Sequence, residues 1–271
     1  MRLGLGSYSF RWALGTPSFT PPEPASLADL VREAGELGVQ VLQVADSPEL
    51  EAATAPELAR LREAAAGVGV HWQIGFTGAT PERLEHFLAA AVALEADVAR
   101  IVIHDSSDTS PEISAIADHA QSYEQAGVTL GIENHFSTTS PRLIEVVESI
   151  GSPAVGVVLD VANSIMCGEW PHETIALLAP HTVCLHLKDY RLESDVDGVG
   201  GHVVGTPLGT GLTDPDAVFA ALRGLDPSLA VIVEQWSPRC DSVEATLEVE
   251  RRWRQTSVAT AAAWLRKERA S

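Results

Sequence analysis

The chain has 271 residues, of which 45% are hydrophobic, and its 18 basic and 37 acidic side chains leave a formal net charge of −19. Such an acidic surface repels phosphate backbones, so we expect no nucleic-acid partner. No apolar run approaches the roughly 18 residues that cross a membrane, and the three cysteines form no CxxC pair, so we expect a cytoplasmic protein without a membrane partner.

Strand and helix patterns alternate along the chain. Short apolar runs rich in Val, Ile and Leu are typical of strands buried on both faces of a parallel sheet. Amphipathic stretches separate them, and several begin with helix-start signals. Ser26 with Asp29 three residues later has the form of a capping box, and Thr80 and Asp214 each precede a proline. In chain order, the predicted strands are Leu3–Tyr8, Val39–Ala45, Val70–Phe76, Val98–His104, Val128–Glu133, Val155–Asp160, Thr182–Leu187 and Leu229–Glu234.

Eight strand–helix units predict an α/β fold, a (β/α)8 TIM barrel that forms a single domain over residues 1–271. The alternative is an open doubly wound sheet, which normally carries a glycine-rich phosphate loop after its first strand. GLGSYS in the first strand lacks the third glycine of such a loop. The Gly/Pro-rich segment Asp197–Pro215 contains no convincing element, and we predict an irregular lid or rim loop there.

Four side chains close the fifth to eighth predicted strands, namely Glu133, Asp160, His186 and Glu234. The carboxyl ends of parallel barrel strands meet at one rim, so we expect these side chains to converge. Three carboxylates placed together repel each other strongly unless a cation lies among them. Oxygen donors with one nitrogen favour one Mn²⁺ ion, with Mg²⁺, Co²⁺ or Zn²⁺ as alternatives.

A metal site of this kind supports proton transfer at carbon. A cation that chelates a carbonyl oxygen and the neighbouring hydroxyl acidifies the C–H bond beside the carbonyl. A carboxylate can then remove the proton to give a cis-enediolate. Return of the proton from the other face inverts the centre, and return to the neighbouring carbon isomerises the sugar. The ligands alone leave both outcomes open.

Five motifs carry a family resemblance, and they cover the C-terminal half of the chain well. The chain resembles the xylose isomerase-like TIM barrel superfamily, the sugar phosphate isomerase/epimerase group, and in particular its ketose 3-epimerase-like members. The resemblance implies that Glu133, Asp160, His186 and Glu234 bind one divalent ion. It also implies that Glu133 and Glu234 act on a carbohydrate from opposite faces, and that the protein forms a homo-oligomer. The motifs are IENH (132–135), LDVANS (159–164), HLKDYR (186–191), PLGTGLTD (207–214) and VEQW (233–236).

Further residues near the predicted strand ends are candidates for substrate binding. Lys188 and Arg191 follow His186 and carry charges that suit a hydroxyl, carboxylate or phosphate. Asn163 stands where epimerase-like relatives often carry histidine. His104 ends the fourth predicted strand, and Trp236 offers an aromatic face for stacking on a sugar.

The sequence therefore predicts a divalent-metal-dependent isomerase or epimerase that acts on a monosaccharide, keto-sugar or cyclitol through a cis-enediolate. A lyase that eliminates the group β to the carbonyl of a 3-oxo glycoside is the main alternative. An endonuclease IV-like nuclease is disfavoured by Asn163 at a ligand position and by the net charge of −19. A non-catalytic sugar-binding protein is the fourth reading.

Overall fold

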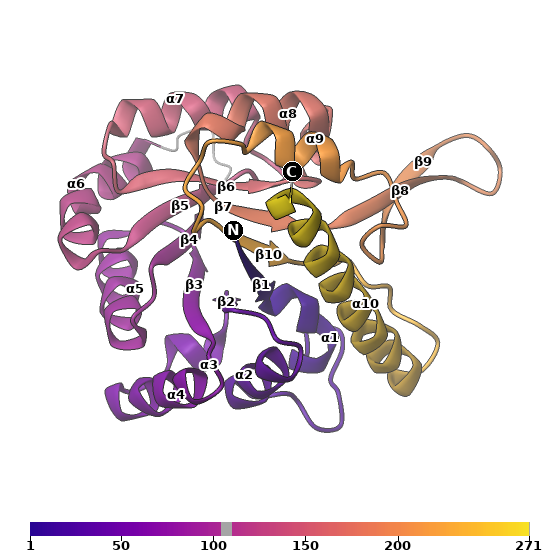
Figure 1. Cartoon of the computed structure of the whole chain (residues 1–271), viewed down its shortest axis with the longest axis horizontal. Helices are drawn as coiled ribbons and strands as arrows, with labels where there is room; N and C mark the ends of the chain where they lie inside the picture. The colour runs from indigo at the N-terminus through magenta and orange to yellow at the C-terminus, as the bar shows by residue number, and fades with distance from the viewer. Residues whose placement is uncertain (104–109, 271) are drawn as a thin grey trace.

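The computed structural model describes residues 1–103 and 110–270. Among these residues, eight parallel strands close into a barrel in the order β1-β10-β7-β6-β5-β4-β3-β2, as Figure 1 shows. The predicted (β/α)8 barrel is thereby confirmed, and the open doubly wound sheet is excluded. The barrel strands are β1 (Arg2–Gly6), β2 (Val41–Ala45), β3 (His71–Thr77), β4 (Val98–Val102), β5 (Thr129–Glu133), β6 (Val155–Asp160), β7 (Thr182–Leu187) and β10 (Ala230–Val233).

Each predicted strand coincides with one of these eight strands, with differences only at the ends. Tyr8 lies beyond β1, in the 3-10 helix η1 (Ser7–Phe10), rather than in the strand. β4 ends at Val102, and His104 lies outside the described residues. The carboxyl ends of the strands and the loops that follow them form the rim that we predicted to carry the site.

Helices surround the barrel on the outside (Figure 1). The Ser26–Asp29 capping box is present at the start of α2, and Asp214 caps α9 through its side chain. No helix among the described residues is long and apolar enough to cross a membrane. The α-helices are α1 (Arg11–Leu14), α2 (Leu27–Glu36), α3 (Pro48–Glu51), α4 (Ala55–Gly67), α5 (Pro81–Leu94), α6 (Ser110–Ala126), α7 (Ser140–Ile150), α8 (Pro171–Leu178), α9 (Pro215–Ala221) and α10 (Val243–Ala270), and the remaining 3-10 helices are η2 (Asn163–Cys167) and η3 (Ala179–His181).

The prediction of an irregular loop over Asp197–Pro215 was wrong at Gly201–Thr206. Within it, β9 (Gly201–Thr206) pairs antiparallel with β8 (Asp189–Ser194), and the hairpin projects away from the barrel in Figure 1. The segment after β9 does fold back, because the Asp189 carboxylate accepts backbone N–H bonds from Gly209, Thr210, Gly211 and Thr213. This clamp returns the chain to the barrel before α9.

The interior of the barrel is divided into an apolar and a polar part. Side chains that point outward from the strands join the helices in one large core, and a second cluster fills the barrel itself. Buried polar side chains from β2, β3, β4 and β7 are also present, namely Gln43, Gln73, Arg100 and His186. Buried polar groups require hydrogen-bond partners, and the partners of these side chains include carboxylates at the rim of the barrel. The apolar interior cluster consists of Val41, Val98, Val158, Cys184, Ala230 and Ile232.

Candidate active site

The four predicted donors meet at the rim, and all are buried. Asp160 on β6 stands in register with His186 on β7, and Glu133 ends the neighbouring strand β5. Nδ1 of His186 lies 3.5 Å from Oε1 of Glu133, 3.6 Å from Oε1 of Glu234 and 3.9 Å from Oδ2 of Asp160. Ligand atoms of Glu133, Asp160 and His186 all lie within 4.8 Å of one another. These three residues therefore form a potential metal site, with the Glu234 carboxylate beside it.

A chain of hydrogen bonds through the barrel orients His186. The Nε2 atom of His186 lies 2.7 Å from Oε1 of Gln43, and Nε2 of Gln43 donates to Oε1 of Gln73 at 3.1 Å. Nε2 of Gln73 donates to Oδ1 of Asp97 at 3.0 Å. Because Oδ1 of Asp97 accepts from Gln73 and Oε1 of Gln73 accepts from Gln43, the Oε1 atom of Gln43 is left as an acceptor for His186. The imidazole therefore keeps its Nε2–H on Gln43 and turns Nδ1 towards the carboxylates.

The surroundings of His186 Nδ1 fit a cation. This buried atom has no hydrogen-bond partner among the described residues. Burial alone would lower the pKa of His186, but the carboxylates of Glu234 and Glu133 outweigh burial and raise the pKa well above its usual value. A site that holds a proton so strongly is a site where positive charge is stabilised, and a metal ion would replace that proton.

Arg100 was missed by the sequence interpretation. It lies in the middle of β4, is 3% exposed, and its Nε donates to Oε2 of Glu133 while Nη1 donates to Oδ2 of Asp46 at 2.8 Å. Gly75 on the adjacent strand leaves room for it, since a Cβ there would lie 3.0 Å from Cδ of Arg100. An arginine inside the otherwise apolar run VARIV was the available signal, because arginine is seldom buried without a partner.

The Glu133 carboxylate is held on both sides. Its Oε1 accepts a hydrogen bond from Nδ2 of Asn163 at 2.9 Å, and its Oε2 accepts from Arg100. Burial would raise the pKa of Glu133, yet Arg100 and His186 keep it well below the usual value. Oδ1 of Asn163 is buried and has no hydrogen-bond partner among the described residues. Asn163 thus has an acceptor available beside the carboxylate that it orients.

Lys188 makes the corresponding contact with Glu234. Its Nζ lies 2.7 Å from Oδ2 of Asp160 and 3.0 Å from Oε2 of Glu234. Burial opposes the charge, but Asp160 and Glu234 raise the pKa of Lys188 above its usual value. Space for Glu234 comes from Gly6, where a Cβ would lie 2.9 Å from Cγ of the glutamate. Each glutamate at the rim is therefore paired with its own buried cation.

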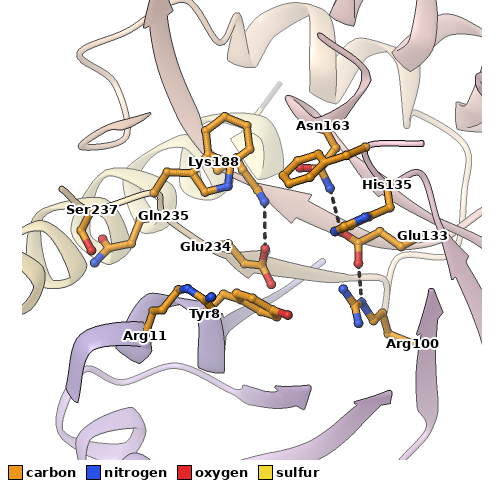
Figure 2. A pocket seen from close by; sticks show the side chains of 12 residues that line it. Tyr8, Arg11, Arg100, Glu133, His135, Asn163, Lys188, Glu234, Gln235 and Ser237 are labelled. Carbon is orange, nitrogen blue, oxygen red and sulfur yellow. Dashed lines mark hydrogen bonds and ion pairs between the residues drawn. The ribbon is translucent and has the colours of Figure 1, made fainter. Parts of the chain in front are cut away.

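A cavity of about 340 Å³ opens above these groups. Figure 2 shows Glu133 beside Arg100 and Asn163, and Glu234 beside Lys188. The ring of Trp236 forms part of the wall, with Nζ of Lys188 5.0 Å from its centroid. The cavity is in the size range of small-molecule sites. Its lining residues are Tyr8, Arg11, Arg100, Glu133, His135, Phe136, Asn163, Lys188, Glu234, Gln235, Trp236 and Ser237.

The structure brings most of the predicted substrate-binding residues to this cavity, but not all. Asn163, Lys188 and Trp236 line it, whereas Arg191 does not. Arg191 lies on the projecting hairpin, where it is exposed and forms an ion pair with Glu193. The structure does not place Arg191 at this cavity, because β8 is buried only at Asp189 and Tyr190 and is largely exposed from Arg191 onward. His104 lies outside the described residues.

A family model described as xylose isomerase-like TIM barrel matches residues 19–268. The chain belongs to this family. The 3-oxo-isoapionate decarboxylase of Pectobacterium atrosepticum is 32% identical over 261 residues, which cover 95% of this chain and 94% of that protein.

Solved structures in the same fold include enzymes and a metal complex. A D-psicose 3-epimerase from Clostridium cellulolyticum H10, solved with D-tagatose, gives a TM-score of 0.74 at 14% identity, covering 100% of this chain and 99% of that one. A xylose isomerase-like TIM barrel protein from Mycobacterium smegmatis, solved with magnesium, gives a TM-score of 0.69 at 16% identity. The match covers 95% of this chain and 97% of that one. At these identities the likeness shows the fold alone. The family resemblance is confirmed, and the choice between isomerase and lyase stays open.

Proposed function

We propose that this protein is a metal-dependent carbon–carbon lyase that removes CO2 from a small polyhydroxylated 3-oxo acid. One observation carries the choice of reaction: the Glu133 carboxylate is occupied on both oxygens, by Arg100 and by Asn163. A carboxylate that a buried guanidinium keeps ionised is a weak base. Decarboxylation needs no base, because the electrons come from the bond to the carboxylate.

The similarity to the Pectobacterium decarboxylase also supports a decarboxylation reaction. It extends over 95% of this chain at 32% identity. The name 3-oxo-isoapionate describes a carboxylate with a carbonyl two carbons away. We infer that this chain acts on an acid of that class. The substrate is then still an oxidised sugar, as the sequence predicted, but the reaction is loss of CO2 instead of the predicted proton abstraction.

The residues that would hold the metal are Glu133, Asp160, His186 and Glu234. The unpartnered Nδ1 of His186 and the carboxylate oxygens around it fit a hard divalent cation such as Mn²⁺ or Mg²⁺. When bound there, the ion would polarise the substrate carbonyl and stabilise the negative charge that develops on its oxygen. Arg100 and Asn163 hold the Glu133 carboxylate in place as a ligand.

The reaction balances without a redox partner. The bond between the carboxylate carbon and the α-carbon breaks, CO2 leaves, and the electron pair moves into the enolate formed with the carbonyl. The α-carbon then takes up one proton. We assign the delivery of that proton to Lys188, because its Nζ lies at the cavity and its contacts with Asp160 and Glu234 leave one of its three N–H bonds for a ligand.

Epimerisation of a keto-sugar is the second candidate, and one observation favours it. Glu133 and Glu234 follow different strands and both line the cavity (Figure 2), and both are about equally near Nδ1 of His186, at 3.5 and 3.6 Å. Two carboxylates at one cavity are the arrangement that removal and return of a proton on opposite faces requires. To act as bases, Glu133 would first have to separate from Arg100, and Glu234 from Lys188.

The test measures CO2 release from 3-oxo acids of small sugars, beginning with 3-oxo-isoapionate, with Mn²⁺ and with EDTA. We expect release that depends on the metal and that falls by at least about 100-fold in Lys188→Met. Lys267→Met is the matched control, because Lys267 is exposed on α10 and pairs with Asp216. Metal-dependent exchange of a ketose C–H without CO2 release from any acid would instead establish the epimerase.

A further inference from the structure

Arg11 occupies a wall shared by two cavities. It begins α1 directly after η1, and it lines both the active-site cavity and a second cavity of about 330 Å³. Tyr8 lines both cavities as well, and the guanidinium carbon of Arg11 lies 5.6 Å from the centroid of its ring. Figure 2 shows Arg11 and Tyr8 side by side below Glu234. A ligand that extends from the metal centre towards the second cavity passes this guanidinium.

The guanidinium of Arg11 has no carboxylate partner among the described residues. By contrast, Arg100 pairs with Glu133 and Asp46, and Lys188 pairs with Asp160 and Glu234. Arg11 is exposed, so its charge is available to a ligand in the cavity.

The balance of charges at the rim indicates what the positive charge of Arg11 contributes to the site. Among the described residues, the ion pairs at the rim join four carboxylates, of Glu133, Asp160, Glu234 and Asp46, to two cations, Arg100 and Lys188. A divalent ion would cancel the two negative charges that remain. The loaded centre would then be neutral, and Arg11 would be the surplus positive charge beside it. Such a balance suits a substrate with one negative charge.

Contacts with the C-terminal helix fix the position of Arg11. The Glu250 carboxylate of α10 accepts the backbone N–H of Trp12 at 2.6 Å and that of Ala13 at 3.0 Å. The indole Nε1 of Trp12 donates to the carbonyl of Ser237 at 3.0 Å, next to the cavity wall. Because the backbone is held at the two following residues, the Arg11 side chain starts from a fixed position beside the cavity.

We propose that Arg11 binds the carboxylate of the substrate and thereby selects a sugar acid over a neutral sugar. The proposal rests on the proposed function for the identity of the acid. A guanidinium can hold a carboxylate through two parallel hydrogen bonds. During decarboxylation the negative charge leaves the carboxylate for the carbonyl oxygen, so this contact is strongest before the reaction. Its loss therefore weakens substrate binding and does not slow the chemical step.

Kinetics of Arg11→Gln, Arg11→Lys and Arg239→Gln test this assignment. We expect Arg11→Gln to raise KM by about 10- to 100-fold without lowering kcat, and Arg11→Lys to recover part of the loss in binding. Arg239 is the matched control, because it is also an exposed arginine over an aromatic ring, that of Phe19 at 5.5 Å, but lines neither cavity. An unchanged KM in Arg11→Gln, or an equal rise in Arg239→Gln, overturns the proposal.

A binding measurement separates this proposal from the proposed function. Gluconate carries the carboxylate without a 3-oxo group, and sorbitol is its neutral counterpart. In calorimetric titrations of the Mn²⁺-loaded protein, we expect Arg11→Gln to weaken gluconate binding about tenfold or more and to leave sorbitol binding unchanged. This result would support anion recognition even if no acid released CO2. Release of CO2 with gluconate binding that is insensitive to Arg11 would retain the lyase and reject the role of Arg11.

Discussion

The guanidinium of Arg100 and the carboxylate of Glu133 form an ion pair inside the barrel, with both side chains almost fully buried. The same guanidinium reaches Asp46, a residue with φ of 51°, and so ties the loop after β2 to the end of β5. Glu133 is thereby kept ionised and held in one orientation. These properties suit a metal ligand better than a base, which is why the pair bears on the reaction as well as on stability.

Replacing Arg100 should destabilise the protein strongly. Arg100→Gln leaves Glu133 and Asp46 without their cation, and breaking a buried ion pair in this way costs about 3–5 kcal/mol. Urea unfolding measures the loss. Arg32→Gln is the control, since Arg32 forms only exposed pairs with Asp29 and Glu36 and should change stability by about 0.5 kcal/mol or less. Equal stability of the two variants would refute the buried pair.

Metal binding should depend on Asp160. Asp160→Asn removes one charged donor of the Glu133–Asp160–His186 group, and we expect the affinity for Mn²⁺ to fall at least about 100-fold. Isothermal titration after EDTA treatment gives the affinity. Glu193→Gln, on the projecting hairpin, should bind as the wild type does. A wild-type affinity in Asp160→Asn would remove this residue from the ligand set.

The hydrogen-bond chain below His186 should also tune the metal affinity. Gln43→Met removes the acceptor at Nε2 of His186, so the imidazole is no longer held with Nδ1 towards the carboxylates. Losing an orienting partner of a metal-binding histidine typically costs 10- to 100-fold in affinity, and we expect a fall in Mn²⁺ affinity of about that size. Gln40→Met tests the same substitution at an exposed position of the preceding loop and should have no effect.

The stability of the protein should carry a pH dependence from Glu250. Burial raises the pKa of this carboxyl to about 7, so the folded state favours its protonated form. This contribution is complete below pH about 4.5 and is lost as the pH rises through 7. Between pH 5.5 and 8 we expect the wild type to lose roughly 2 kcal/mol of unfolding free energy relative to Glu250→Gln. Urea titrations of both proteins at the two pH values measure it, and parallel curves would contradict the assignment.

The fold and the metal donors were accessible from the sequence for a common physical reason. Strands buried on both faces appear as apolar runs, and Glu133, Asp160, His186 and Glu234 stand where those runs end. The direction of a side chain within a strand depends instead on how the barrel closes. Arg100 and Gln43 point into the barrel only because of the register between neighbouring strands, and the sequence does not reveal that register.

The projecting hairpin and Arg11 escaped prediction for different reasons. β8 and β9 pair through backbone hydrogen bonds, and the exposed Leu192 and the glycines around residue 200 disguise the strand pattern. Arg11 was singled out because its guanidinium has no carboxylate partner in the described part of the chain, and this can be seen only when the side chains are placed in space.

Decarboxylation in deuterated buffer tests the central claim most directly, with mass and NMR analysis of both product and remaining substrate. We predict that the Mn²⁺-loaded protein releases CO2 from the 3-oxo acid and leaves one deuterium on the former α-carbon of the product, with none in the unreacted acid. Deuterium in the recovered substrate without release of CO2 would contradict the lyase and indicate reversible proton abstraction by the paired glutamates.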